Sequence, residues 1–170
     1  DRGFLRLGEH GSFGADVALD PKGRLLAVGY AYRRSRTDAL IVRFDQRGVL
    51  DKRFGNGGVV RQSFGKSDRA VAVWTQPDGR IVVVGHHSKY KNAAFRLNDD
   101  GSLDPSFGDG GVSVIELGEG SGDAFVTRAA QGPDGAIVAA GYLSHEKRAL
   151  IAKLDRDGRP ASGFGDGGRV

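Results

Sequence analysis

Three stretches of the chain place basic side chains beside aromatic ones at corresponding positions. They span residues 30–36, 86–91 and 142–148. An arginine guanidinium binds a carboxylate or phosphate through two parallel hydrogen bonds, and a tyrosine ring attracts cations to its face. These stretches therefore predict a surface for an anion, a glycan or a protein partner. The candidate contact residues are Tyr30, Tyr32, Arg33, Arg34, Arg36, His86, His87, Lys89, Tyr90, Lys91, Tyr142, Lys147 and Arg148.

The same stretches have a simpler interpretation as solvated hairpin tips, in which lysine and arginine protect the edges of sheets. Acidic residues at positions 9, 68, 119 and 123 are expected on the same rim, where they dilute its positive charge. The net charge of +4 is modest, and a dedicated nucleic-acid binder concentrates more positive charge on one element. We therefore expect no specific nucleic-acid partner.

The adjacent histidines, His86 and His87, are the first candidates for a metal site. Neighbouring side chains on an extended strand point to opposite faces, so the two are poorly placed to chelate one ion. The positions that correspond to His86 hold Tyr30 and Tyr142. A partly buried aromatic position is the favoured interpretation, and no metal is expected.

Four aspartates within residues 99–109 offer the oxygen ligands that calcium prefers. The ligand order of an EF-hand is absent, and Gln46 and Arg47 replace Asp99 and Asp100 in an earlier copy of the same motif. Aspartates of this kind also initiate turns by accepting hydrogen bonds from their own backbone. Turn formation is the favoured explanation, and we expect no cofactor.

The sequence shows no constellation for covalent catalysis. It has no cysteine, no serine in a Gly-x-Ser-x-Gly context, and no phosphate-binding loop that opens a helix. The pattern Phe-Gly-Asp-Gly-Gly leads into a predicted strand and so lacks the helix N-terminus that binds anions. We therefore expect a protein that is not an enzyme, with a propeller hydrolase or lyase as the third alternative.

Internal repetition shows which elements must position these residues. Pro-x-Gly followed by an apolar run to glycine occurs at 21–29, 77–85 and 133–141, at intervals of 56 residues. Phe-Gly-Asn/Asp-Gly-Gly follows each of them, at 54–58, 107–111 and 164–168. Short strands separated by glycine turns at such a period are typical of β-propellers. The 28 glycines fall at fixed positions of the repeat and therefore indicate turns rather than disorder.

Each copy is predicted to form four short strands. In the middle copy they cover residues 69–74, 80–84, 93–97 and 112–117. The second strand contains Ile-Val-Val-Val, which is apolar on both faces and therefore requires cover on both sides. Stacked blades provide such cover. The fold class is thus predicted as all-β, a propeller-type array of three four-stranded repeats at approximately 8–63, 64–117 and 118–170, in one domain.

The middle copy carries a recognisable signature. It reads Pro-Asp-Gly-Arg-Ile-Val-Val-Val-Gly from residue 77, and Phe-Arg-Leu-Asn-Asp-Asp-Gly-Ser-Leu-Asp-Pro-Ser-Phe-Gly-Asp-Gly-Gly-Val from residue 95. This pattern resembles the delta-60 repeat family of bacterial proteins. The resemblance implies a propeller-like repeat that often occurs in exported or surface proteins, and it brings no catalytic residues. The third copy departs from the pattern, with Pro160-Ala161-Ser162-Gly163 in place of Leu-Asp-x-x.

Three blades are too few for an ordinary closed propeller, which has four to eight. Residues 1–7 correspond to a fourth strand without its own repeat, and we expect them to complete the last blade or to pair with another chain. An open arc exposes apolar blade faces. Two hypotheses follow: two chains form a six-bladed homodimer, or the chain belongs to a longer ring. A binding or assembly module is the favoured function, ahead of a lectin-like or anion-binding propeller.

Overall fold

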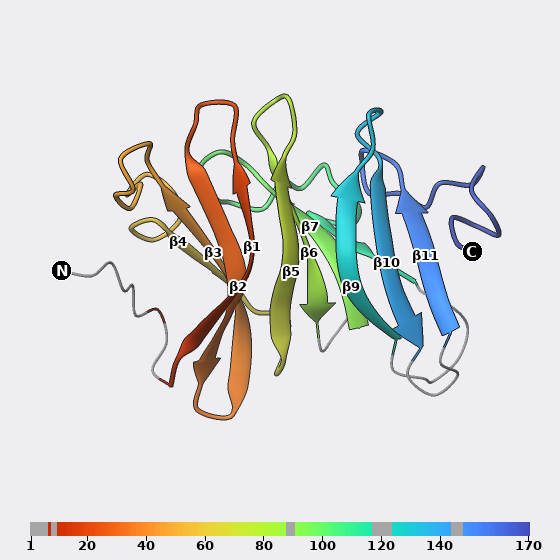
Figure 1. The fold of residues 1–170 in the computed structure, drawn as a ribbon, viewed down its shortest axis with the longest axis horizontal. Coiled ribbons are helices and arrows are strands. Elements are labelled where there is room, and N and C mark those ends of the chain that lie inside the picture. The colour runs from red at the N-terminus through yellow and green to blue at the C-terminus, as the bar shows by residue number, and fades with distance from the viewer. Residues whose placement is uncertain (1–6, 8–9, 88–90, 117–123, 144–147) are drawn as a thin grey trace.

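Three antiparallel sheets lie side by side in the computed structural model of the protein (Figure 1). The structure describes residues 7, 10–87, 91–116, 124–143 and 148–170. Each sheet is called a blade here. Blade 1 contains β1 (Ser12–Leu19), β2 (Leu25–Arg33), β3 (Arg36–Phe44) and β4 (Val59–Gln62); blade 2 contains β5 (Asp68–Thr75), β6 (Ile81–His87), β7 (Lys91–Leu97) and β8 (Val112–Val114); blade 3 contains β9 (Ala124–Gln131), β10 (Ile137–Leu143) and β11 (Arg148–Leu154). The predicted all-β, propeller-type array of three repeats is confirmed.

Strands within a blade follow chain order, so that each one pairs with its successor. The first strands of neighbouring blades, β1, β5 and β9, contact one another. Pro-x-Gly forms the turn between the first two strands: the Gly79 N–H donates to the Gln76 carbonyl at 2.9 Å, and the φ of Gly79 is +86°. Among the described residues there is no helix that could span a membrane.

The glycine that closes the apolar run is required by a bulge in the preceding strand. Pairing shifts register between Gly14 and Asp16 in β1, and between Ala70 and Ala72 in β5. A Cβ on Gly29 would lie 1.8 Å from the carbonyl oxygen of Phe13, and one on Gly85 would lie 2.0 Å from that of Arg69. No side chain fits there. A bulge that brings two backbones into close approach therefore explains the repeated glycine.

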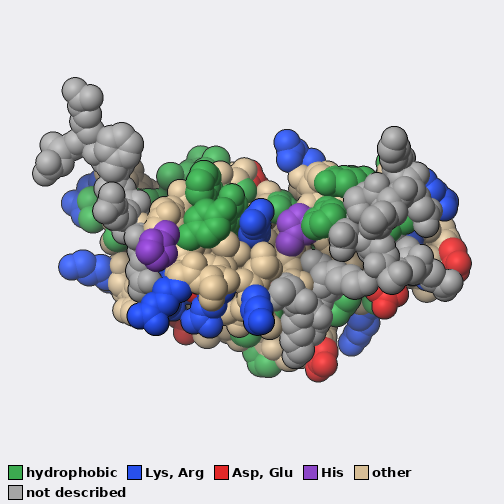
Figure 2. Space-filling view, turned by 90° about the horizontal axis from the view of Figure 1, so that it is seen from below, with side chains coloured by type: hydrophobic (Ala, Val, Ile, Leu, Met, Phe, Trp, Pro, Cys, Tyr) green, Lys and Arg blue, Asp and Glu red, His purple; other side chains and the backbone are tan. Residues whose placement is uncertain are grey.

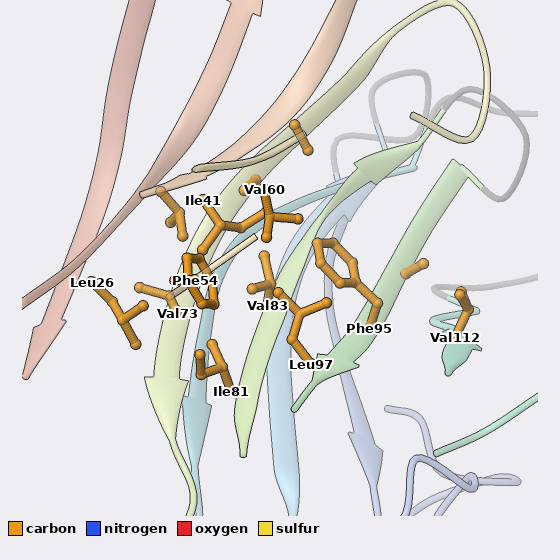
Figure 3. Packing of buried hydrophobic residues seen from close by; sticks show 14 residues of the cluster. Leu26, Ile41, Phe54, Val60, Val73, Ile81, Val83, Phe95, Leu97 and Val112 are labelled. Atoms are coloured by element: carbon orange, nitrogen blue, oxygen red, sulfur yellow. The ribbon is translucent and has the colours of Figure 1, made fainter. Parts of the chain in front are cut away.

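Two of the three hydrophobic clusters lie between blades, and the third, smaller one lies on the outer face of blade 1. Figure 3 shows the first, in which Leu26 and Ile41 of blade 1 face Val83 and Phe95 of blade 2. The second joins Val82 and Val84 of blade 2 to Ile137 and Ala152 of blade 3. Because β6 contributes to both clusters through alternate residues, its apolar run from Ile81 to Val84 is covered on both sides.

A repeated joint fastens each blade to the next. In the first joint, the Phe54 ring is fully buried beneath the guanidinium of Arg43, whose carbon lies 4.5 Å from the ring centre. Arg43 binds the Asp51 carboxylate at 3.0 Å and reaches the carbonyl of Asp99 in blade 2 at 2.6 Å.

The second joint repeats this construction one blade later. Arg96 lies over the buried Phe107 ring at 4.9 Å, binds Asp104 at 2.7 Å, and donates to the carbonyl of Arg156 in blade 3 at 3.0 Å. Phe-Arg-Leu and Leu-Asp-x-x-Phe-Gly in the sequence are therefore two halves of one inter-blade fastening. Arginine is well suited to the joint because its planar guanidinium donates hydrogen bonds to several acceptors at once.

The two chain ends differ from the expected arrangement. Leu7 packs on blade 1, against the cluster that contains Leu40 and Val42, and its carbonyl accepts a hydrogen bond from Arg61. The free edge of β11 pairs instead with Val170, which exchanges backbone hydrogen bonds of 2.8 and 3.0 Å with Ile151. Leu7 therefore does not lie on the last blade, because blades 1 and 3 form opposite ends of the arc (Figure 1). Residues 1–6 lie outside the described residues.

Candidate functional site

The basic and aromatic stretches of the sequence lie on one edge of the molecule. This edge, called the rim here, is formed where β2, β6 and β10 end and where β1, β5 and β9 begin. Figure 2 looks onto it from below and shows hydrophobic, basic and histidine side chains gathered over its middle. All three stretches share the rim because successive strands of each blade alternate in direction.

Six side chains form a continuous row along the rim. Strand pairing places Phe13 opposite Tyr30, Arg69 opposite His86, and Phe125 opposite Tyr142, one pair in each blade. The Phe13 and Tyr30 rings stack with centroids 5.2 Å apart, and the Phe125 and Tyr142 centroids are 5.8 Å apart. These six residues are called the stacked row.

Contacts between blades make the row continuous. The Arg69 guanidinium of blade 2 lies 4.7 Å from the centre of the Tyr30 ring of blade 1, a cation–π geometry. His86 meets Phe125 of blade 3 with ring centroids 5.3 Å apart. The second member of each pair thus contacts the first member of the next pair. Sequence reasoning found the second members but missed Phe13, Arg69 and Phe125, because they precede their partners by a whole strand.

The arginines of the first stretch surround this row without joining it. Arg33 and Arg36 lie 3.7 and 3.8 Å from the buried carboxylate of Asp38, and their side chains are nearly half exposed. Arg34 occupies the hairpin tip with a φ of +46° and is exposed. Tyr32 makes edge contacts with Phe13 and Tyr30. Blade 1 therefore supplies the most basic part of the rim that the structure describes.

The two adjacent histidines point to opposite faces, as predicted. His86 belongs to the stacked row, and its Nδ1 lies 3.0 Å from the Asn92 side-chain oxygen. Burial lowers the pKa of His86; the Asn92 bond opposes this effect, and the charge of Arg69 adds to it.

His87 has no access to the rim surface. Its side chain is wholly buried between Phe64 and Phe95, and its Nδ1 lies 3.6 Å from the Asp68 carboxylate. Burial lowers the pKa of His87 to about 4, although the Asp68 charge acts in the other direction. His87 is therefore an interior residue rather than a ligand contact, because alternation along β6 turns it into the core.

The remaining candidates are only partly described. Arg148 begins β11 and is exposed, and the backbone of Lys91 pairs with His87 at the start of β7. Lys89, Tyr90 and Lys147 lie outside the described residues.

The aspartates of the calcium hypothesis serve the joints and turns. Asp99 accepts hydrogen bonds from Lys22 at 3.0 Å and Arg43 at 2.8 Å, both from blade 1. Partial burial raises the pKa of Asp99, but hydrogen bonds from Arg24 and Lys22 outweigh this and hold it at about 2. Burial raises the pKa of Asp104, but hydrogen bonds that Ser106 and Arg96 donate to its carboxylate outweigh this effect and hold it at about 2. Within the described parts of the chain, no three acidic or histidine side chains converge as metal ligands.

Comparison with known protein families supports the architecture. Residues 76–107 match a family model described as a domain of unknown function (DUF5122) beta-propeller. The matched segment runs from the turn before β6 to Phe107, so it contains the arginine, the aspartate and the phenylalanine of the second joint. A search of curated proteins found no match. The comparison thus shows a propeller-like repeat, without indicating the delta-60 family in particular.

A second candidate surface was missed by sequence reasoning about loops. The outward face of blade 1 exposes Val17 by 64% and Leu19 by 70%. Across β2, Val17 is in line with Val42 of β3, and Leu19 is in line with Phe44. Val42 and Phe44 belong to the apolar cluster on the outer face of that blade. Blade 3 exposes Ile151 by 40% on its own outward face. In the middle copy the equivalents of Val17 and Ile151, Val73 and Ala94, are buried, and the equivalent of Leu19, Thr75, is half-buried.

Proposed function

We propose that this chain is a non-catalytic binding or assembly module that engages a protein partner through the outward faces of its two terminal blades. One observation carries this proposal. Each blade has two apolar faces. A neighbouring blade covers both faces of blade 2 but only one face of blade 1 and one of blade 3, and Leu7 covers only part of the outer face of blade 1. Exposed apolar patches of this kind mark sites of protein association.

The exposed positions are strongly apolar for a surface. Val17, Leu19 and Ile151 are all branched aliphatic residues, and Val17 and Ile151 correspond to Val73 and Ala94, which neighbouring blades bury in the middle copy. Full burial of such a side chain stabilises an association by roughly 1.5–3 kcal/mol. A partner that covers either face therefore gains from several such contacts at once.

The experiment measures the mass of the purified chain by sedimentation equilibrium across concentration, with one charge placed on each face in turn. Leu19→Glu and Ile151→Glu are expected to weaken any association, because each buries a carboxylate against an apolar surface. Val114→Glu is the matched control, since Val114 is 42% exposed but belongs to the middle blade. A chain that stays at 18.0 kDa at all concentrations, or one whose association is as sensitive to Val114→Glu, contradicts the proposal.

A second candidate function is recognition of an anionic or glycan ligand at the rim. It is favoured by the stacked row, whose Phe13 and Tyr142 ends are 53% and 44% exposed, beside the arginines of residues 33–36. Rigid aromatic side chains next to arginine forks suit planar or anionic groups.

This candidate is tested by binding to a sulfated polysaccharide and to a glycan array. The triple change Arg33/Arg34/Arg36→Ala is expected to abolish binding. The control Arg47/Lys52/Arg53→Ala removes the same formal charge from exposed residues at the opposite edge. Equal losses in both variants indicate attraction by net charge alone and contradict a rim site.

A further inference from the structure

Each of the two joints has a donor half and an acceptor half, on different blades. The donor half is the Phe-Gly pair, whose glycine N–H donates to a turn carbonyl of the next blade: Gly55 to Asp100 at 2.7 Å, and Gly108 to Asp157 at 2.9 Å. The acceptor half is the glycine of that turn, on which the phenylalanine ring rests. A joint therefore needs two blades, and one blade carries one half of each of two joints.

The acceptor glycine has no room for a side chain when its joint is formed. A Cβ on Gly101 would lie 3.0 Å from the Phe54 ring, and one on Gly158 would lie 2.8 Å from the Phe107 ring. Both glycines have positive φ, at +89° and +84°. The ring and the bare backbone thus fit closely in both joints.

Blade 3 carries a donor half for which the described residues offer no acceptor. Phe164 and Gly165 occupy the same place in the Phe-Gly-Asp-Gly-Gly motif as Phe54-Gly55 and Phe107-Gly108. Phe54 and Phe107 are fully buried, whereas Phe164 is partly exposed. The local backbone is nevertheless the same, since the Phe164 N–H donates to the Ala161 carbonyl as the Phe107 N–H does to that of Asp104.

Blade 1 carries an acceptor half without a donor. Gly48 ends the turn that corresponds to the turns of Gly101 and Gly158, and its φ is +77°. Among the described residues, apart from its chain neighbours, no atom lies within 4 Å of the place where its Cβ would be. Gln46 and Arg47, whose equivalents supply the accepting carbonyls in blades 2 and 3, are exposed.

The stacked row ends in the same complementary way. Between blades, the second member of one pair contacts the first member of the next pair, as Tyr30 does with Arg69 and His86 with Phe125. In the described part of the chain, Tyr142 is a second member with no following pair, and Phe13 is a first member with no preceding one. The stacked row on the rim and the joints on the opposite edge therefore both indicate that blade 3 associates with blade 1.

We propose that the occupant of both terminal faces is a second copy of this chain, docked head to tail through the same joint that fastens the blades. Phe164 of one copy rests on the turn of Gly48 in the other, the Gly165 N–H donates to the Arg47 carbonyl, and Tyr142 meets Phe13. This inference rests on the proposed function and specifies its partner. Two copies related by a two-fold axis close a ring with two such joints, giving six blades, a number within the usual range of propellers.

The intermolecular joint is weaker than the internal ones for an identifiable reason. Lys153 stands where Arg43 and Arg96 stand in the other copies, and Ala161 stands where Asp51 and Asp104 stand. A lysine presents a point charge instead of a planar fork, and the carboxylate beside it is that of Asp134, at 3.8 Å, rather than one at the place of Asp51 and Asp104. The sequence thus preserves the shape of the joint in blade 3 while reducing its strength, which makes the dimer dissociable.

The test compares dissociation constants from sedimentation equilibrium for three variants. Gly48→Asn fills the acceptor with a residue that tolerates positive φ, and it is expected to weaken the dimer at least about tenfold. Gly110→Asn is its matched control, because Gly110 has a φ of +59°, equally open surroundings and a place in the middle blade. Lys153→Arg combined with Ala161→Asp restores the full joint and is expected to tighten the dimer about tenfold or more.

A mixing experiment establishes the direction of docking. Gly48→Asn damages only acceptors, and Phe164→Ala damages only donors, so a mixture of the two variants retains one intact joint per ring. The mixture is expected to dimerise more strongly than either variant alone. A face-to-face dimer, in which blade 1 meets blade 1, gives no such recovery.

The outcomes separate this inference from the proposed function. Association that is weakened by Leu19→Glu and Ile151→Glu but unaffected by Gly48→Asn overturns the head-to-tail joint and leaves the assembly function standing. A chain that remains monomeric at several hundred micromolar overturns both. Equal effects of Gly48→Asn and Gly110→Asn also overturn the joint, since they indicate a general loss of stability, which thermal unfolding measures directly.

Discussion

The middle blade and the last blade share a sequence pattern but differ in what covers it. Ile81, Val82, Val83 and Val84 of β6 are each no more than 1% exposed. In β10 only Ile137 and Ala139 reach that level, while Val138 and Ala140 on the other face are half-buried. The repeat thus gives every blade two apolar faces, and each face is fully buried only where a neighbouring blade packs against it.

The largest expected contrast concerns the phenylalanine of the joint. Phe107→Ala is expected to lower the free energy of unfolding by about 3–5 kcal/mol, because it empties a fully enclosed site beneath Arg96. Phe164→Ala is expected to cost less than about 1 kcal/mol in dilute protein, where its ring is partly exposed. Urea unfolding of both variants at one low concentration makes the comparison. Similar losses for the two variants contradict a difference between covered and uncovered blades.

A feature internal to each blade is expected not to distinguish the terminal and middle blades. Gly29→Ala and Gly85→Ala each direct a Cβ into a backbone carbonyl at 1.8–2.0 Å, and both are expected to cost about 3 kcal/mol or more. Gly79→Ala has open space at its Cβ and is expected to cost only about 1 kcal/mol, from its positive φ. Thermal unfolding ranks the three. A much smaller loss of stability for Gly29→Ala than for Gly85→Ala means that the backbone of the terminal blade rearranges more easily to accommodate the added Cβ.

The buried His87 makes the stability of the protein depend on pH. This contribution comes from the middle blade, because the corresponding residues of the other blades, Ala31 and Leu143, do not titrate. The His87 pKa of about 4 lies below the 6.5 of an unfolded histidine, so the unfolded chain binds more protons between these values. Stability is therefore full above pH 6.5 and falls as pH decreases toward 4, by about 2 kcal/mol at pH 5. Denaturant titrations at pH 7.5 and 5 measure the loss.

His87→Leu supplies the control for this pH dependence, since blade 3 carries leucine at the same position. The variant is expected to lose most of the slope between pH 7.5 and 5. An unchanged slope assigns the effect to other groups. Asp104, with a pKa of about 2, adds its own loss only below about pH 4, where its carboxylate becomes protonated and releases Arg96.

The smallest effect concerns the contact between blades 1 and 2 in the stacked row. Arg69→Met is expected to raise the pKa of His86 toward its ordinary value, because the positive charge beside the imidazole is removed. It is also expected to lower stability by about 0.5–1 kcal/mol through loss of the cation–π contact with Tyr30. An NMR titration of His86 measures the first effect. Arg34→Met, at the exposed hairpin tip, is expected to leave the titration unchanged.

Much of the fold could be predicted because the repeat contains its own turns and strands. The strand predicted at residues 93–97 is β7, and the run from Ile81 to Val84 is covered on both sides as its composition required. Residues 1–7 were expected to complete the last blade or to pair with another chain; of these only Leu7 is described, and it packs on blade 1 of its own chain. No local pattern could have shown this, since the choice depends on how three blades are arranged in space.

The candidate site was only half visible. Tyr30, His86 and Tyr142 share a phase of the repeat, and so the sequence indicated them together. Their partners Phe13, Arg69 and Phe125 lie a whole strand earlier in each copy, and only cross-strand pairing brings them alongside. His87 was included because it neighbours His86, yet the alternation of a strand turns it into the core.

By itself, the sequence determined the three blades, their turns, and the glycine that each bulge requires, because these depend on short-range sterics repeated at a fixed interval. Tertiary structure decided which copies of a shared motif are completed. Phe54 and Phe107 are enclosed because another blade follows them, while Phe164 and Gly48 remain open at the two ends. The physical reason is that a joint belongs to two blades, so its state depends on contacts between segments far apart in the chain.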